Sequence, residues 1–243
     1  MAVEGKKSSP VLWVVVGCAG AIVLGIIVLS VLAFFGYRAA KRVQSDIKDP
    51  AAREARVLEV LGGSKIPEGY HPVLGMSIPI VMDLALLSDR ELPVGREPGQ
   101  GELFGERGFI FVRMVSRESR RKGLEDYIAG RSDDAEALRR AGIGLGRGET
   151  LKRGTLDLPG TKAAHYLARR SNVSFGGSSS GRSIVSMIDV ECAGSSKLNF
   201  GIWFAADQNP EGTPVQSLEL TGTPADETAL AAFLSSFHLC PAS

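Results

Sequence analysis

The sequence predicts an α+β protein: an N-terminal transmembrane helix and a helical stalk, then a mostly antiparallel sheet with a C-terminal helix packed on one face. Three features support this prediction: a long apolar run, several short alternating segments separated by Gly-, Pro- and Ser-rich turns, and a capped amphipathic segment near the C-terminus. We expect four regions: a short polar tail at 1–10, a transmembrane helix at 11–36, a juxtamembrane helical stalk at 37–63 and a soluble α+β domain at 64–243.

The N-terminal apolar run predicts a single membrane-spanning helix. No charged residue occurs from Val11 to Phe35, and a helix of that length exceeds the ~30 Å hydrocarbon core of a bilayer. Trp13 and Tyr37, near its two ends, are of the types that favour membrane interfaces. The run is longer than the apolar part of a cleaved signal peptide, so we expect an uncleaved signal anchor, with the lipid bilayer as a partner.

The flanking charges leave the orientation of this helix open. More basic residues follow the run than precede it, which favours a cytoplasmic C-terminal domain. The short N-terminal tail and the cysteines of the soluble part favour the opposite orientation. We expect a single-pass protein of the bacterial inner (cytoplasmic) membrane, with its C-terminal domain extracytoplasmic.

Two patterns inside the apolar run raise the questions of helix association and of lipidation. Gly17, Ala21 and Gly25 recur at every fourth position, which suggests the hypothesis of a homodimer through the transmembrane helix. The preferred interpretation is that Gly and Ala are common in such helices anyway. The residues up to Cys18 are similar to the lipobox of bacterial lipoproteins, but apolar residues follow where a lipoprotein turns polar, so an unlipidated anchor is preferred.

Capping residues and alternation predict the elements of the soluble domain. Asp49 and Pro50 begin a helix that ends at Gly62 and Gly63. Pro79, inside an alternating run, indicates an edge strand or a break between two strands. The remaining predictions are a long polar loop at 88–107, strands at 109–115, 150–158, 161–169, 184–192 and 198–204, and short helices at 124–129 and 134–141.

The last predicted element is an amphipathic helix. Thr223 and Pro224 begin it, and its apolar residues fall on one face that must pack against the sheet, namely Leu230, Phe233, Leu234 and Phe237. Cys240 follows this helix and Cys192 ends a strand, so a disulfide between them is possible in an oxidising compartment.

Candidate catalytic residues lie between the predicted strands. The segment 177–181 fits the GxSxG pattern of α/β-hydrolases, which makes Ser179 a candidate nucleophile and His165 a candidate base. The pattern lies between two strands rather than between a strand and a helix, so a hairpin loop is the preferred interpretation. Asp189 and Glu191 share a strand face, as in acid–base sites, and Arg121 lies in a short basic cluster; ordinary exposed surface explains both.

Other function classes are excluded by charge and spacing. The chain has 28 basic and 27 acidic residues, so no overall field favours nucleic acid. The glycines at 142, 144, 146 and 148 follow a helix and precede a strand, the wrong order for a dinucleotide site. The histidines and cysteines lack the spacing of metal ligands. We therefore expect no cofactor and no metal.

The anchor, the entry segment 66–70 and the closing segments 221–224 and 238–240 together resemble membrane-anchored bacterial envelope proteins of uncharacterised function. The order of elements also resembles small α+β folds of the PsbP/Mog1 type. Neither resemblance implies an activity. We expect a non-enzymatic binding or structural module that binds an envelope protein through the 88–107 loop or an exposed sheet face. The alternative is a small membrane-tethered serine hydrolase or esterase.

Overall fold

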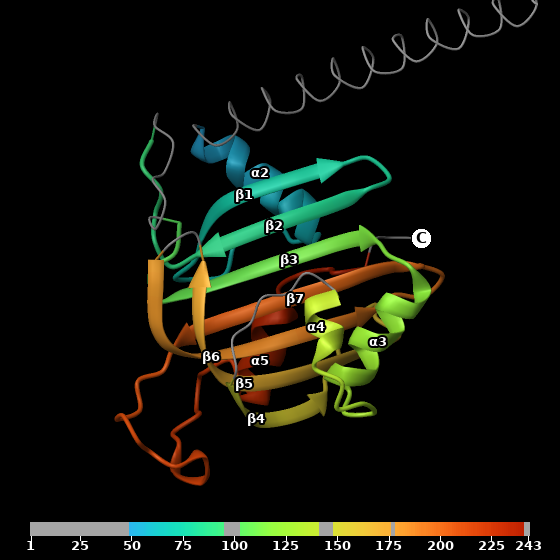
Figure 1. The fold of residues 1–243 in the computed structure, drawn as a ribbon. Helices are drawn as coiled ribbons and strands as arrows, with labels where there is room; N and C mark the ends of the chain where they lie inside the picture. The colour runs from blue at the N-terminus through green and yellow to red at the C-terminus, as the bar shows by residue number, and fades with distance from the viewer. Residues whose placement is uncertain (1–48, 95–102, 141–147, 176–177, 241–243) are drawn as a thin grey trace, which may run out of the picture. The chain divides into compact units, whose positions relative to one another are not determined.

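The computed structural model describes residues 49–94, 103–140, 148–175 and 178–240. By its internal contacts the chain divides into two units, Met1–Ser45 and Asp46–Ser243, and the described residues all belong to the second. This second unit is built on one seven-stranded sheet (Figure 1).

The sheet consists of two meanders joined side by side. Its strand order is β1-β2-β3-β7-β6-β5-β4, and every neighbouring pair is antiparallel. The first meander is β1 to β3, the second is β4 to β7, and the pairing of β3 with β7 joins them. The strands are β1 (His71–Ile78), β2 (Met82–Ser88), β3 (Arg107–Val115), β4 (Gly148–Thr155), β5 (Ala163–Phe175), β6 (Ser178–Glu191) and β7 (Lys197–Ala206).

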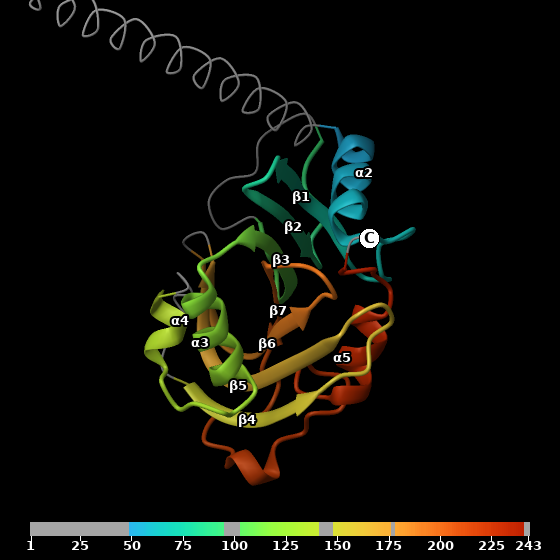
Figure 2. The same ribbon diagram turned by 90° about the vertical axis from the view of Figure 1, so that its right-hand side faces the viewer.

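Helices pack on both faces of this sheet. Two of them, α3 (Glu118–Ile128) and α4 (Glu136–Arg140), lie in the connection from β3 to β4 and pack on one face over β5, β6 and β7. The other face carries α2 (Pro50–Leu61) and α5 (Glu227–Leu234), as Figure 2 shows. A short 3₁₀ helix, η1 (Val215–Ser217), lies in the connection from β7 to α5.

The helix α2 is part of the folded unit. Its N-cap Asp49 accepts a hydrogen bond from the backbone N–H of Ala51, and Gly62 ends it with a φ of 67°. It lies so close to β1 that a Cβ on Gly75 would be 2.4 Å from the carbonyl carbon of Arg56. The predicted helical stalk is therefore wrong for these residues, because the apolar side of the helix is buried against the sheet.

The sheet separates two apolar clusters. On the side of α2 and α5, the ring of Phe233 stacks on Trp203 at 4.7 Å between centroids, and Leu230 is fully buried. On the side of α3 and α4, Leu124 and Ile128 are buried against residues of β5, β6 and β7. Both faces of the central strands are therefore apolar.

The membrane part of the predicted fold class is corrected. Among the residues that the structure describes, no helix is long and apolar enough to cross a membrane. The longest of these helices, α2, has 12 residues and spans about 18 Å, against a hydrocarbon core of ~30 Å. The predicted segment 11–36, with Gly17, Ala21, Gly25 and Cys18, lies outside the described residues.

Two predictions that depend on that helix are corrected with it, namely the single-pass signal anchor and localisation in the bacterial inner membrane. The described residues give no support to the lipid bilayer as a partner or to a homodimer through the helix. The structure that replaces the predicted fold class is a seven-stranded antiparallel sheet with short helices on both faces.

Candidate binding site

An apolar surface covers the first meander on the side of the sheet that carries α3. Side chains point to this side at every second position of β1, β2 and β3, and the strand registers place them in cross-strand rows. The rows are Leu74, Leu86 and Ile110, then Met76, Leu84 and Val112, then Ile78, Met82 and Met114. We call these residues the apolar face.

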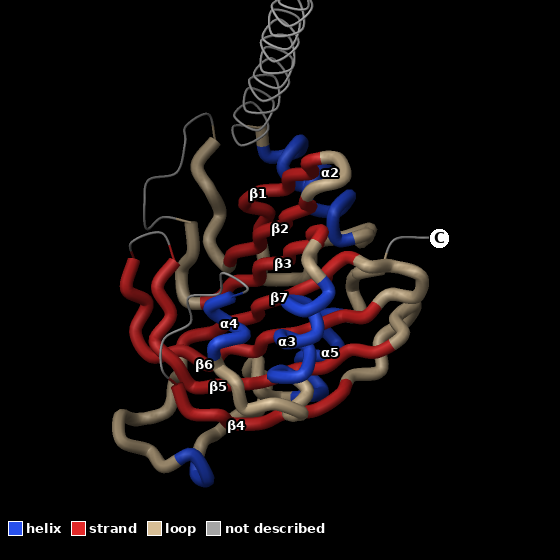
Figure 3. The backbone as a smooth tube through the Cα atoms, turned by 45° about the vertical axis from the view of Figure 1, so that its right-hand side comes forward, coloured by secondary structure: helices blue, strands red, loops and turns tan. Residues whose placement is uncertain are grey.

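The apolar face is only half buried. All of its residues are partly exposed, and Ile78 is 39% exposed. The same rows continue on β7 as Ile202, Phe200 and Leu198, which are 7%, 5% and 3% exposed. Figure 3 shows α3 and α4 beside the first meander, and none of the described helices packs over the apolar face.

One end of the apolar face carries further exposed apolar residues. Ile80 and Val81, in the β1–β2 turn, are 84% and 57% exposed, and Val115 at the end of β3 is 61% exposed. The backbone N–H of Val115 donates to the carbonyl of Val81 at 3.2 Å, so the turn and the strand end lie together. Ile80 has a φ of 71°, which a β-branched residue adopts only under strain.

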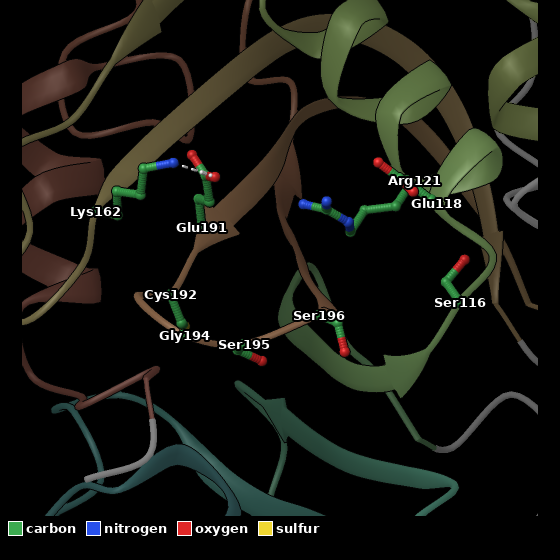
Figure 4. Close-up of a pocket in the computed structure, with 9 residues that line it drawn as sticks. All are labelled: Ser116, Glu118, Arg121, Lys162, Glu191, Cys192, Gly194, Ser195 and Ser196. Atoms are coloured by element: carbon green, nitrogen blue, oxygen red, sulfur yellow. Dashed lines mark hydrogen bonds and ion pairs between the residues drawn. The ribbon is translucent and has the colours of Figure 1, made fainter. Parts of the chain in front are cut away.

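A polar pocket of about 430 Å³ lies at the same end, between the start of α3 and the β6–β7 turn (Figure 4). Arg121 extends into it from the first turns of α3, with Ser116, Ser195 and Ser196 around its rim. Within the described part of the chain, the Arg121 guanidinium has no hydrogen bond or ion pair. Lys162, also in the pocket, is neutralised by Glu191 at 2.7 Å.

A buried carboxyl group lies beneath α3 near this pocket. Asp189 of β6 is 5% exposed. Burial, reinforced by the negative charge of Glu125, raises the pKa of Asp189 to about 7, while Arg121 acts in the opposite direction. The carboxyl group of Asp189 is therefore partly protonated at neutral pH.

The structure does not bring the two predicted catalytic residues together. His165 is paired with Asp189, whereas the backbone of Ser179 is paired with Ser174 at the other end of the β5–β6 hairpin. The stretch of β5 from His165 to Ser174 spans roughly 30 Å at ~3.3 Å per residue. A nucleophile and its base must lie within hydrogen-bond distance, so this pair does not form a hydrolase site.

Other sequence candidates have different outcomes. Cys192 and Cys240 form a disulfide, with their Cα atoms 5.5 Å apart. Arg121 and Glu191 belong to two different candidate groups in the sequence. In the structure they line the same pocket. The dimer face of Gly17, Ala21 and Gly25 lies outside the described residues.

The apolar face was not predicted, although the sequence contains a signal for it. Strand β2 is apolar at successive positions from Leu84 to Leu87, and β3 likewise from Phe109 to Val112. An antiparallel strand with one solvated face alternates instead, so such a run indicates apolar residues on both faces. One face of these strands packs against α2 and α5, and the other is the apolar face.

Comparisons with known proteins define no family for the chain. No protein-family model matches it, and no curated protein sequence matches it significantly. Among solved structures, it is similar to the Ran-binding protein Mog1p of Saccharomyces cerevisiae, with a TM-score of 0.39 and 14% identity over 71% of this chain and 84% of that chain. A TM-score this low carries no inference about function.

Proposed function

We propose that the chain is a non-enzymatic protein-binding module that holds a helix of a partner protein against the apolar face. The observation that carries the proposal is the continuity of the cross-strand rows: on β7 they lie buried beside α3 and α4, and on β1 to β3 they are partly exposed. A partner helix there would complete the layer that α3 and α4 begin.

The dimensions of the apolar face suit one helix. Strands lie ~4.8 Å apart, so the first meander is roughly 10–14 Å wide, close to the ~10 Å diameter of a helix with its side chains. The stretch of β1 from Leu74 to Ile78 is roughly 13–16 Å long at ~3.3 Å per residue, which corresponds to about ten helical residues.

Charge at one end of the apolar face indicates the polarity of the partner. Arg117, which precedes α3, is exposed. Its side chain forms no ion pair with any other described residue. A partner helix with acidic residues at this end would be electrostatically complementary.

The likeness to the Ran-binding protein Mog1p does not support the proposal, because a TM-score of 0.39 is too low to carry an inference about function. The proposal depends on the apolar face alone, and it names the chemistry of the partner rather than its identity.

The test is selection of a displayed library of amphipathic helical peptides on the full chain, followed by fluorescence anisotropy on the enriched peptides. We expect Leu84→Glu and Ile78→Glu to weaken binding at least tenfold, about 1.4 kcal/mol, because each places a charge in the apolar face. Val94→Glu is the matched control, since Val94 is 69% exposed and follows the opposite end of β2. Thermal unfolding checks that each variant is folded.

Three results would contradict the proposal. The first is that no library member binds the full chain. The second is equal affinity for wild type and Leu84→Glu. The third is a wild-type dimer, measured by light scattering, that Leu84→Glu converts to a monomer, because a second copy would then occupy the face.

A further inference from the structure

We infer that the pocket beside α3 binds a carboxylate side chain of the partner helix, with Arg121 as the cation that holds it. The inference depends on the proposed function, since the carboxylate is carried by the helix on the apolar face. It assigns a ligand class to a pocket that the apolar face alone does not explain.

Arg121 is the group in the pocket with unused binding capacity. Its guanidinium points into the cavity (Figure 4) and forms no hydrogen bond or ion pair among the described residues. A guanidinium offers parallel N–H donors whose spacing matches the two oxygens of a carboxylate. The hydroxyl groups of Ser195 and Ser196 line the same space and can donate to a bound oxygen, whereas the hydroxyl of Ser116 donates to the carbonyl of Arg117 at 3.5 Å.

The other charges of the pocket favour a singly charged ligand. Lys162 is held by Glu191, so it adds little net charge. Glu118 lies at the rim, in the first turn of α3, and would repel a second negative charge. A carboxylate has the single charge that Arg121 can neutralise, whereas a phosphate brings a second negative charge that Glu118 would repel.

The pocket adjoins the apolar face directly. Ser116 follows Val115, at the end of β3, and Val115 contacts the β1–β2 turn through its hydrogen bond to Val81. A helix lying on the apolar face with its end toward this turn therefore brings one side chain to the mouth of the pocket. The partner motif that follows is an apolar helical stripe with a glutamate or aspartate about one turn beyond it.

The test compares three forms of a peptide from the library that binds the apolar face. One has glutamate at the pocket end and an amidated C-terminus, the second has glutamine there, and the third has glutamine with a free C-terminal carboxylate. On wild type we expect the glutamate peptide to bind about tenfold more tightly than the glutamine peptide. We expect Arg121→Gln to bring this ratio to about one and to leave the affinity of the glutamine peptide unchanged.

The control variant is Lys122→Gln, which removes a charge from the same helix. Its side chain is 68% exposed, pairs with Asp126 at 3.3 Å and does not line the pocket. We expect it to keep the tenfold ratio. A ratio lowered equally by both variants would show a general charge effect and overturn the inference.

The remaining outcomes separate the two proposals. A tenfold ratio that persists in Arg121→Gln overturns the pocket inference and leaves the binding module intact, because both peptides still bind. Tight binding by the free C-terminus alone would reassign the carboxylate from a side chain to the end of the partner chain. No binding by any of the three peptides would overturn both proposals.

Discussion

His165 of β5 and Asp189 of β6 lie directly opposite each other in the strand register, on the face of the sheet that carries α3. Cross-strand neighbours of this kind have Cβ atoms ~5 Å apart. The charged groups that act on Asp189 are Glu125 and Arg121 of α3, Glu191 of β6, and Arg131. The histidine predicted as a catalytic base is therefore the neighbour of a buried carboxyl group rather than of a serine.

Replacing this carboxyl group is expected to stabilise the protein at high pH. The pKa of Asp189 is raised from 3.8 to about 7 in the folded chain. Between these values the folded state binds more protons than the unfolded state, so stability falls as pH rises from about 4 to about 7 and is constant above that. Asp189→Asn removes the titrating group and therefore this loss of stability. Urea unfolding should show a gain of up to about 4 kcal/mol at pH 8 and a smaller gain at pH 5. An equal change at both pH values would contradict the prediction.

Relieving the strain at Ile80 is expected to stabilise the β1–β2 hairpin. Val81 donates to the carbonyl of Ile78 at 3.0 Å, with Pro79 and Ile80 between them, and Ile80 has a φ of 71°. A positive φ at this position of a turn suits glycine. Ile80→Gly should raise the free energy of unfolding by about 1 kcal/mol in denaturant titrations. Val81→Gly, one residue along, serves as the control and should not stabilise the protein.

The close approach of α2 and β1 makes Gly75 intolerant of a side chain. A Cβ there would lie 2.5 Å from the backbone nitrogen of Val57. Gly75→Ala should therefore destabilise the protein by more than about 2 kcal/mol, because backbone atoms must move apart. Gly181→Ala is the matched control, since nothing lies within 4 Å of the added carbon. Equal melting temperatures for the two variants would show that α2 does not pack on β1 this closely.

Removing the charge of Asp207 is expected to be strongly destabilising. Its side chain is fully buried, and Oδ2 accepts from Nε of Arg170 and from Nε of Arg182, each at 2.7 Å. Burial alone would raise the pKa of Asp207. The hydrogen bonds from Asn209 and the two arginines lower the pKa by more than burial raises it, so the net shift is downward. Asp207→Asn leaves two cations without their shared anion, at a cost of about 3–5 kcal/mol. Chemical unfolding near pH 7 measures this cost, and a change below about 1 kcal/mol would contradict the prediction.

Local patterns predicted much of the secondary structure but not its arrangement. The alternating segments correspond to strands β4 to β7, and the apolar spacing near the C-terminus corresponds to α5, although its N-cap is Asp226 rather than the predicted Thr223. The pairing of β3 with β7 could not be predicted, because it joins segments far apart in the chain. The segment of α2 was predicted as part of a helical stalk, because the burial of Val57 and Leu61 depends on where β1 lies.

The candidate site depends on such long-range contacts. Arg121 and Glu191 are separate candidates in the sequence, and they line a common pocket only because α3 packs against β6. The serine pattern failed for the corresponding reason. Ser179 and His165 lie on adjacent strands, yet the hairpin register separates them by most of its length.

The disulfide makes the C-terminal part of the chain a covalent ring. It joins Cys192 to Cys240 across a sequence separation of 48, and the ring contains β7, η1 and α5. A protease that cuts the exposed segment near Glu211 and Gly212 opens this ring without releasing either piece. The nicked protein therefore migrates as one band on a non-reducing gel and as two after reduction, so the gel reports both the cut and the redox state of the cysteines.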